Sequence, residues 1–384
     1  MPKLEKQMQY LHKSISLKRY ITLLLIVIGI FLFYHAVIWH RYTSKLLDIQ
    51  KPNHIGDLAR IGYQLSSIHS RIQSETLPKK HLEFSQWKGE NIDILTIGDS
   101  FSNGGGGGEN PYYQDFIASD CNLTVMNINP SLFGENYLKA TAALLSSGLL
   151  EKINPKAVLI ESVERYTLGR FSKPIQWDQN FSQEQLFNDL KKGQWGDGKP
   201  PKEDISFISI ANYKLPLYNL YYQFTPNAFG YSNTYKLSLS KPMFTVKAAS
   251  TLLIFEHDIT SLGGVTREGV TSMNDNFNHL ASLLASKNIQ LIYMIAVDKY
   301  DLYEPYIARN PYGENPLFDL LRPMKKNYIF IDTKAILSQH IDKGEKNIFY
   351  SDDTHWSNKA SEKIANDPIF IFLQNKTMFS HDSK

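Results

Sequence analysis

Short apolar runs alternate with helix-like segments along most of the chain after residue 90. The runs predict buried strands at residues 92–97, 123–128, 157–161, 289–297 and 328–331. Apolar residues that recur every three or four positions predict helices at residues 138–150, 270–284 and 333–340. Strands and helices that alternate at this spacing favour right-handed crossovers and a parallel sheet. The pattern therefore predicts an α/β fold.

The first apolar run is of a different kind, because residues 20–39 contain no charged side chain. About 20 such residues, at about 1.5 Å each in a helix, match a hydrocarbon core of about 30 Å. Tyr20, Tyr34 and Trp39 stand near the ends of the run, as interfacial aromatic residues do. We expect a single transmembrane helix here, in which His35 is an interfacial passenger rather than a ligand.

The flanking charges give this helix an orientation. Residues 1–19 carry five basic residues and one acidic residue, whereas only Arg41 and Lys45 follow closely after the run. We expect residues 1–19 to be a cytoplasmic tail and the chain beyond the helix to lie outside the cytoplasm. A cleaved signal peptide is the alternative, but the run is long and no small-x-small site follows it.

Composition narrows the function classes further. The formal net charge is +3, and the tail alone carries +4, so the remainder carries −1 and offers no basic patch for nucleic acid. The single cysteine, Cys121, cannot form an internal disulfide, and a buried inert thiol is favoured over a reactive one. The sequence contains no cluster of zinc ligands and no phosphate-binding Gly-Lys-Ser/Thr motif, so we expect neither metal nor cofactor.

Two segments depart from the α/β pattern. Residues 40–89 predict a connector with an amphipathic helix that either packs on the following domain or serves as a partner-binding stalk. Its apolar stripe consists of Leu58, Ile61, Leu65, Ile68 and Ile72. Residues 167–255 are rich in aromatic residues and predict an insertion over the carboxyl ends of the strands. These aromatic rings could stack on sugars or fill a core.

The first predicted strand ends at Gly98-Asp99-Ser100, and five glycines follow at residues 104–108. A small hydroxyl residue on a sharp turn after a strand is where an α/β fold presents a nucleophile, although such a turn is also ordinary helix capping. A hydroxyl nucleophile needs a base, and the base needs a carboxylate to orient it. Far along the chain, His355 follows Asp352 and Asp353 on one short loop. The candidate catalytic residues are therefore Ser100, His355 and one of these aspartates.

At these motifs the sequence resembles the SGNH (GDSL) hydrolase superfamily over roughly residues 90–370. The string Asp353-Thr354-His355-Trp356, with residues 160–166 and 297–303, is more similar to the membrane-anchored branch that acetylates exported polysaccharides, such as alginate O-acetyltransferases. This resemblance implies a three-layer α/β fold and an acyl-serine intermediate. It favours Asp353, at −2 from the histidine, over Asp352, at −3.

The resemblance also implies residues for the oxyanion and the substrate. Gly134 matches a glycine whose N–H enters the oxyanion hole, although a turn glycine fits the same position. The usual asparagine of the third block is missing, and Arg165 stands after that strand instead. Arg165 could supply a positive charge to an oxyanion or form a salt bridge with Glu161 or Glu164. The remaining candidates are Lys299 and Tyr303, for which loop capping is the alternative, and Trp356.

We therefore expect an envelope-anchored O-acyltransferase that moves an acetyl group through Ser100 to a hydroxyl of a cell-envelope polysaccharide. The resemblance implies a multi-spanning membrane partner that delivers the acyl group. It places the catalytic domain, residues 90–384, in the periplasm of a bacterium or outside the cell. Two alternatives remain open, namely an esterase that deacetylates the same glycan and a non-catalytic scaffold that binds polysaccharide.

Overall fold

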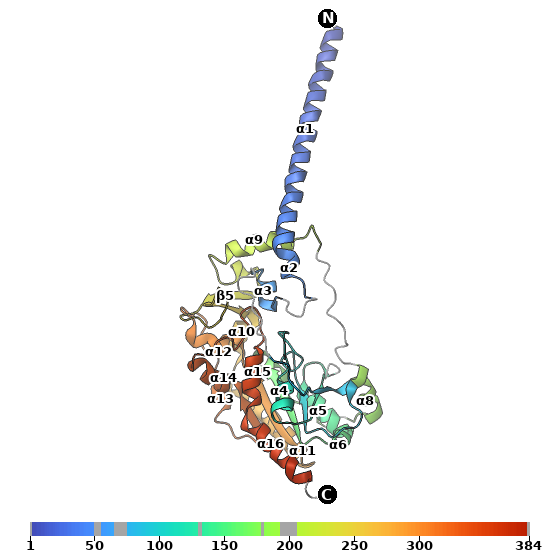
Figure 1. Cartoon of the computed structure of the whole chain (residues 1–384), viewed down its shortest axis with the longest axis vertical. Coiled ribbons are helices and arrows are strands. Elements are labelled where there is room, and N and C mark those ends of the chain that lie inside the picture. Colours follow the sequence, from blue (N-terminus) through green and yellow to red (C-terminus); the bar gives the residue numbers. More distant parts are fainter. Residues whose placement is uncertain are drawn as a thin grey trace.

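A six-stranded sheet forms the centre of the computed structural model, which describes residues 2–49, 55–64, 75–129, 133–177, 180–192 and 206–381 (Figure 1). All neighbouring strands are parallel, in the order β1-β3-β2-β4-β7-β8. The strands are β1 (Leu82–Glu83), β2 (Ile94–Ile97), β3 (Val125–Ile128), β4 (Ala157–Val163), β7 (Gln290–Ala296) and β8 (Ile329–Asp332). The predicted α/β class and parallel sheet are confirmed, and only the short β1 lies outside the predicted pattern.

The apolar runs form central strands because both faces of the sheet are covered. Every residue of β2, β3 and β4 is buried, and strands of this kind read as continuous apolar runs. Ile97, at the end of β2, lies opposite Ile128 in β3 and Ile160 in β4. The segments that follow these strands therefore emerge at one edge of the sheet, where α/β proteins build their sites.

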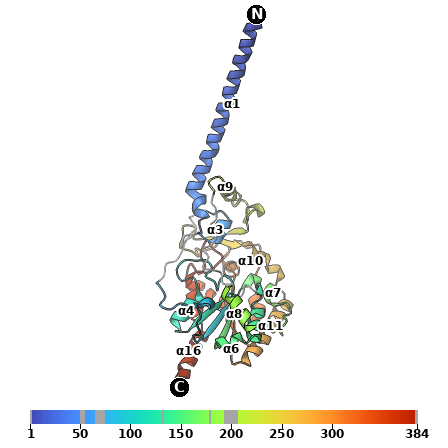
Figure 2. The ribbon, with the colours of Figure 1, turned by 90° about the vertical axis from the view of Figure 1, so that its right-hand side faces the viewer.

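Two groups of helices cover the sheet. One group consists of α4 (Tyr113–Asp120), α14 (Thr333–Asp342) and α15 (Asn358–Ala365). The other consists of α5 (Tyr137–Ser146), α7 (Glu164–Phe171) and α13 (Leu317–Leu321), packed around the long α11 (Arg267–Ala285). Figure 2 shows α4 and α11 on opposite sides of the strands. The further helical segments are α6 (Leu149–Ile153), α10 (Glu256–Thr260), α12 (Lys299–Tyr303), α16 (Pro368–His381), η3 (Phe84–Gln86), η5 (Ala228–Gly230), η6 (Leu262–Gly264) and η7 (Glu304–Tyr306).

The amino-terminal helix projects from the rest of the molecule (Figure 1). α1 (Pro2–Ile38) continues through a π-helical turn, η1 (Trp39–Thr43), into α2 (Ser44–Leu46). Residues 16–46 are long and apolar enough to cross a membrane, by length and composition alone. His35, expected to be a passenger, is instead buried at the lower end of α1 and hydrogen-bonded to Asn212. That expectation is wrong, because α1 packs there against another helix of the chain.

The described part of the connector packs on the rest of the molecule. α3 (Asp57–Ile61) is followed by the cap residue Gly62, and the predicted stripe residues 65, 68 and 72 lie outside the described residues. α3 contacts the antiparallel hairpin of β5 (Thr234–Ser238) and β6 (Thr251–Phe255). The small apolar cluster around it consists of Leu46, Ile55, Leu58, Ala59, Leu215 and Leu253. This cluster joins the end of the amino-terminal helix to the domain below it.

Residues 167–255 are distributed over several parts of the fold. The predicted boundary at residue 167 falls inside α7, which packs against β4, β7 and α11. α8 (Gln183–Lys192) packs against η3 and α6, whereas α9 (Ala211–Tyr221) and the β5–β6 hairpin lie between the sheet and the lower end of α1 (Figure 1). Residues 178–179 and 193–205 lie outside the described residues. The segment is therefore not one separate insertion in the described structure.

Candidate active site

The turn after β2 presents Ser100 at the edge of the sheet. The carbonyl of Ser100 accepts hydrogen bonds from the backbone N–H groups of Asn103 and Gly105, at 3.2 and 2.7 Å. The Asp99 carboxylate accepts one from the N–H of Phe101 at 3.1 Å. These bonds close a tight turn and leave the Ser100 side chain exposed. The residue is therefore both fixed and accessible, as a nucleophile requires.

The loop before α15 brings a histidine to this hydroxyl. His355 Nε2 lies 2.7 Å from Ser100 Oγ, across a separation of 255 residues. The opposite ring nitrogen, Nδ1, lies 2.6 Å from Asp353 Oδ1, which also accepts the backbone N–H of His355 at 3.0 Å. The structure thus joins Ser100, His355 and Asp353 in one series of hydrogen bonds. In such a series the histidine can take the hydroxyl proton while the carboxylate fixes its tautomer.

Asp353 also controls the charge of the imidazole. Burial lowers the pKa of His355, but the hydrogen bond and the negative charge of Asp353 outweigh it, and the net pKa lies above the ordinary value. A carboxylate at this distance favours the imidazolium, which is the form produced when the histidine takes a proton.

The two aspartates have different partners. Asp352 is buried, and its Oδ2 accepts the backbone N–H of Gly56 at 2.9 Å. The carbonyl of Asp352 accepts the N–H of Ala59, in α3, at 3.1 Å. Asp353, not Asp352, is the aspartate that the structure brings to His355. Asp352 instead attaches the loop to α3.

The glycine run explains how the histidine comes so close to the turn. A Cβ atom on Gly105 would lie 2.3 Å from His355 Nε2, well inside contact distance. Gly106 has a φ of +85°, and a Cβ there would lie 3.1 Å from that of His355. These two positions require glycine because the imidazole packs directly on the backbone.

A buried ionic network fixes the turn from behind. Asp99 Oδ2 accepts the N–H of Val163 at 2.8 Å and pairs with the Arg170 guanidinium at 2.5 Å. Glu161 Oε2 accepts the N–H of Asp99 at 3.0 Å and the Ser102 hydroxyl at 2.8 Å. Burial, reinforced by the charge of Asp99, raises the pKa of Glu161 well above its ordinary value. The network joins the Ser100 turn to the end of β4.

Three predicted substrate residues lie beneath the loop rather than in the pocket. The buried Lys299 ammonium donates to the carbonyls of Tyr350, Ser351 and Asp353, at 2.7 to 3.2 Å. Burial lowers its pKa to about 8, against the opposing effect of nearby aspartates. Tyr303 is buried and accepts the N–H of Phe349, and the Trp356 ring packs edge-on against Phe101. Lys299 and Tyr303 thus bond the loop, as the loop-capping alternative predicts, and none of the three residues lines the pocket beside Ser100.

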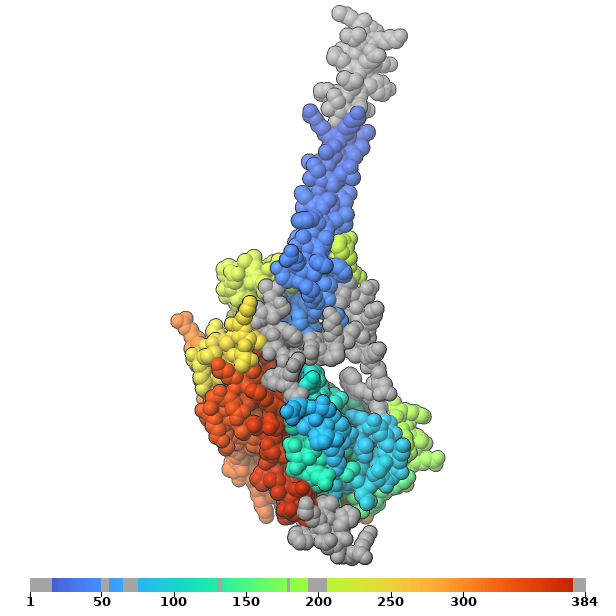
Figure 3. All heavy atoms as spheres, in the orientation of Figure 1, coloured from blue at the N-terminus to red at the C-terminus, as the bar shows by residue number. Residues whose placement is uncertain are grey.

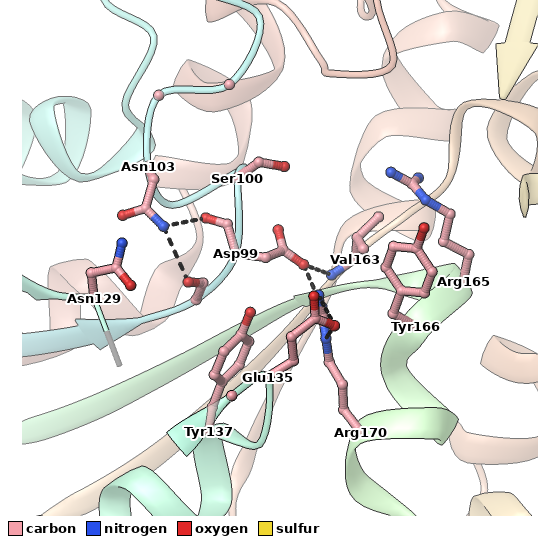
Figure 4. Close-up of a pocket in the computed structure, with 14 residues that line it drawn as sticks. Asp99, Ser100, Asn103, Asn129, Glu135, Tyr137, Val163, Arg165, Tyr166 and Arg170 are labelled. Atoms are coloured by element: carbon pink, nitrogen blue, oxygen red, sulfur yellow. Dashed lines mark hydrogen bonds and ion pairs between the residues drawn. The ribbon is translucent and has the colours of Figure 1, made fainter. Parts of the chain in front are cut away.

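A pocket of about 640 Å³ opens beside Ser100 (Figure 4). Asn103 and Asn129 lie on one side of it, and Arg165 and Tyr166 lie on the other. The lining residues are Gly98, Asp99, Ser100, Asn103, Gly104, Gly105, Asn129, Gly134, Glu135, Tyr137, Val163, Arg165, Tyr166 and Arg170. None of the described aromatic residues between 172 and 255 is among them. The sugar-stacking surface expected of that segment is therefore not part of this pocket.

Two predicted oxyanion candidates do line the pocket. Gly134 has a φ of +60° and open space on its Cβ side. Arg165 forms ion pairs with Asp298 and, at 3.2 Å, with Asp258. Its salt-bridge partners are thus not Glu161 or Glu164, because the end of β7 and α10 bring Asp298 and Asp258 closer. The guanidinium charge at the pocket is largely balanced by these two carboxylates.

Two residues near the site, Asn129 and Asp57, are not among the site residues that the sequence predicts. Asn129 follows β3, and its buried Nδ2 has no hydrogen-bond partner among the residues that the structure describes, although Asn129 lines the pocket. Its position after a buried strand is a signal that could have identified it. Asp57, at the start of α3, accepts the Thr354 N–H at 2.8 Å and the Thr354 hydroxyl at 2.6 Å. No local pattern connects Asp57 with a loop 297 residues away.

Within the described residues, one group of side chains has the composition of a metal site. Asp57, Asp353 and His355 offer ligand atoms that all lie within 4.8 Å of one another. Each of these groups already has a hydrogen-bond partner within the chain, since Asp353 bonds His355 and Asp57 bonds Thr354. The arrangement is complete as an acid–base series without an ion.

Comparison with known proteins does not assign the chain to a family. No protein-family model matches it, and no curated protein is similar to it in sequence. The geometry of the site therefore carries the functional argument.

Proposed function

We propose that this chain is a membrane-anchored O-acyltransferase of the SGNH type that acetylates a hydroxyl of a cell-envelope or exported polysaccharide. The observation that carries the proposal is the series Ser100–His355–Asp353, with contacts of 2.7 and 2.6 Å, beside an open pocket. A hydroxyl within reach of an imidazole that a carboxylate orients is the arrangement that activates a serine nucleophile.

The proposed reaction has two halves. In the first, His355 takes the proton of Ser100 while Oγ attacks the acyl carbonyl of the donor, and the imidazolium then protonates the departing donor group. In the second, His355 takes the proton of the acceptor hydroxyl, whose oxygen attacks the acyl-serine ester. Ser100 leaves and regains its proton from the imidazolium. Asp353 stabilises the imidazolium in both halves, and neither half requires a metal or cofactor.

The pocket supports a carbohydrate acceptor. Its volume of about 640 Å³ lies within the range of small-molecule sites. Its lining contains two tyrosine rings, Tyr137 and Tyr166, and two amide side chains, Asn103 and Asn129. Aromatic faces and amide groups together suit a sugar ring, which has apolar faces and a polar rim.

The amino-terminal helix supports the proposed location. Its length and apolar composition suit a single span, and the basic residues that precede it favour a cytoplasmic amino terminus. The catalytic domain would then lie outside the cytoplasmic membrane of a bacterium. Because acyl donors are made inside the cell, a multi-spanning membrane protein that passes the acyl group outward is the partner that this location requires.

The second candidate function is an esterase that acts on the same acylated glycan. The exposure of Ser100 favours it, because water that reaches an acyl-serine hydrolyses it. The two functions use the same residues and differ only in whether water or a sugar hydroxyl accepts the acyl group.

The test uses the full chain in detergent with a chromogenic acetyl ester, with and without an unacetylated oligosaccharide. Release of the chromophore measures acylation of the chain, and mass spectrometry of the sugar measures transfer. We expect Ser100→Ala to abolish both and Ser286→Ala, which changes an exposed hydroxyl on another helix end, to leave both unchanged. Hydrolysis without transfer would assign the esterase function. Sugar binding without any turnover would assign the scaffold and overturn the proposal.

A further inference from the structure

The segment at residues 206–231 exposes large apolar side chains on the surface of the molecule. Lys214 is its only charged residue. The exposed apolar residues include Ile210, Leu217, Leu220, Phe224, Phe229 and Tyr231, and the exposed fraction reaches 67% at Ile210 and 68% at Phe224. Contiguous exposed apolar surface of this kind marks a contact site rather than a surface in water.

α9 is apolar on both of its sides. Its inward side buries Ala211, Leu215 and Tyr218 together with the hydrogen-bonded Asn212. Its outward side carries a stripe that advances by three or four residues at each step, from Ile210 through Tyr213 to Phe224. A helix on a protein surface normally turns charged and polar residues outward. The outward stripe of α9 therefore requires an apolar neighbour.

The same helix is fixed to the lower end of α1. Asn212 Nδ2 lies 2.7 Å from His35 Nδ1, and Asn212 Oδ1 accepts the Thr43 hydroxyl at 2.6 Å. The Tyr34 hydroxyl donates to the carbonyl of Asn212 at 2.7 Å, and its ring stacks on Tyr213 with 5.3 Å between centroids. His35, Thr43 and Asn212 are completely buried. These contacts place α9 at the level where the apolar run of α1 ends.

α9 also faces the side from which α1 projects. Figures 1 and 2 show it running across the lower end of α1, on the end of the domain nearest that helix. In Figure 3 the yellow-green atoms of this region flank the lower end of the blue helix. Only 6% of the most apolar 18-residue stretch of the amino-terminal helix is buried within the chain, and its exposed apolar side chains thus continue into the exposed stripe of α9.

We propose that the outward face of α9 and the loop that follows it to Tyr231 lie in the interfacial region of the bilayer that α1 spans. A bilayer that covers α1 must end near residues 34–43, which are the residues that hold α9. Aromatic residues gather at both helices there, as they do at membrane interfaces. The exposed apolar side chains of a helix at a membrane surface enter the boundary between headgroups and acyl chains, and Lys214 can extend its amine to the headgroups. The proposal does not depend on the acyl-transfer function.

The test places the full chain at one copy per lipid nanodisc and reads the environment of a fluorophore. An environment-sensitive dye is attached to Leu220→Cys or Phe224→Cys in a Cys121→Ala background. Leu25→Cys, within the apolar run of α1, reports whether that helix is in the bilayer. Glu362→Cys, at an exposed position of α15, is the water-exposed control. Quenching by nitroxide-labelled lipids is compared with quenching by aqueous iodide.

We expect lipid quenching at residues 220 and 224 to exceed that at residue 362 severalfold, and iodide quenching to show the opposite order. The proposal would be overturned if lipid and iodide quench the dye at residues 220 and 224 to the same extent as at residue 362. Lipid quenching at residue 25 would show in the same experiment that α1 is in the bilayer. If residues 220 and 224 become shielded only when two or more copies share a disc, the surface binds a second copy and the bilayer assignment also fails.

Discussion

At the scale of single residues, the site depends on how closely three side chains are held. Ser100 is fixed by its turn, and His355 is fixed by a short hydrogen bond to Asp353 and by the glycine backbone beneath it. The bond to Asp353 sets both the orientation and the proton affinity of the imidazole. Substitutions that change the charge next to His355 can therefore be tested separately from substitutions that change the volume of the backbone beneath it.

Asp353→Asn is expected to lower kcat/KM for the chromogenic ester by about 10³- to 10⁴-fold, because the amide no longer favours the required tautomer. The acid limb of the pH profile should also move. In the unmodified protein the raised pKa of His355 places that limb above the ordinary histidine value, since the base must be neutral to act. Without the negative charge of Asp353 the limb should shift to lower pH.

Asp352→Asn is the matched control for Asp353→Asn, because it changes the neighbouring carboxylate, which bonds Gly56 instead of the histidine. We expect the acid limb to stay in place and the activity to fall much less. Equal losses in the two variants, with neither limb displaced, would contradict the assignment of Asp353.

Gly105→Ala tests volume without charge. Its methyl group would lie 2.3 Å from His355 Nε2, so either the ring or the Ser100 turn must move. A displacement of about 1 Å at reacting atoms costs about 10²-fold in rate, and we expect kcat/KM to fall by about that factor. Gly263→Ala, which has open space around the added carbon, should leave the rate unaltered.

At the scale of secondary-structure elements, α3 acts as a brace for the loop that carries His355. Its first residues bond Asp352, Asp353 and Thr354, although α3 itself stands close after the amino-terminal helix. A Cβ on Gly56 would lie 2.2 Å from the carbonyl oxygen of Asp352, which shows how tightly the two segments pack. The loop is thus held by Lys299 on one side and by α3 on another.

Asp57 supplies the test of this brace. Asp57→Leu removes both acceptors of Thr354, and an unpaired buried donor costs about 1–3 kcal/mol, so we expect kcat/KM to fall by at least about tenfold. Asp57→Asn keeps an acceptor and should restore most of that rate. Because the charge of Asp57 contributes to the raised pKa of His355, the acid limb in Asp57→Asn should move to lower pH. An unmoved limb in both variants would indicate that α3 does not influence the imidazole.

At the scale of the whole molecule, the periodic signals predicted most of the fold. The strands at residues 94–97, 125–128 and 290–296 lie within predicted runs, because strands buried on both faces must be continuously apolar. The strand predicted at residues 157–161 extends two residues further, to Val163, because the buried Ser162 hydroxyl accepts a hydrogen bond from Arg170 in the network around Asp99. Periodicity cannot reveal a polar residue that is buried because a distant partner satisfies it.

The same limit applies to the site. Ser100 and the loop at residues 352–355 could be singled out because short motifs carry their chemistry. For Lys299 the sequence left a site role and loop capping open, and its ammonium bonds the loop carbonyls, as loop capping predicts. The contribution of Asp57 and the docking of α1 on Asn212 join segments 297 and 177 residues apart, without a local pattern. Tertiary contacts of this kind become visible only in three dimensions.

The docking of the amino-terminal helix leads to the last prediction. Asn212→Leu leaves His35, Thr43 and the carbonyl of Phe207 without the partners that Asn212 gives them. Each buried group that loses its partner costs about 1–3 kcal/mol, and the loss falls on α9 and the end of α1 rather than on the sheet. We expect amide hydrogen exchange to accelerate in α9, α2 and α3 of the full chain while β4 and β7 keep their protection.

Asn276→Leu is the matched control for this variant, because Asn276 bonds two backbone carbonyls on the opposite part of the domain, those of Phe171 and Lys173. It should leave α9 protected. Faster exchange in β4 and β7 of Asn212→Leu would mean that the helix docking supports the entire domain. Unchanged exchange in α9 would mean that the small apolar cluster around Leu58 and Leu215 holds the two parts together without the buried polar group. α3 belongs to that cluster and also braces His355. If hydrogen exchange in α3 accelerates in Asn212→Leu, we therefore expect ester turnover, measured on the same sample, to fall as well.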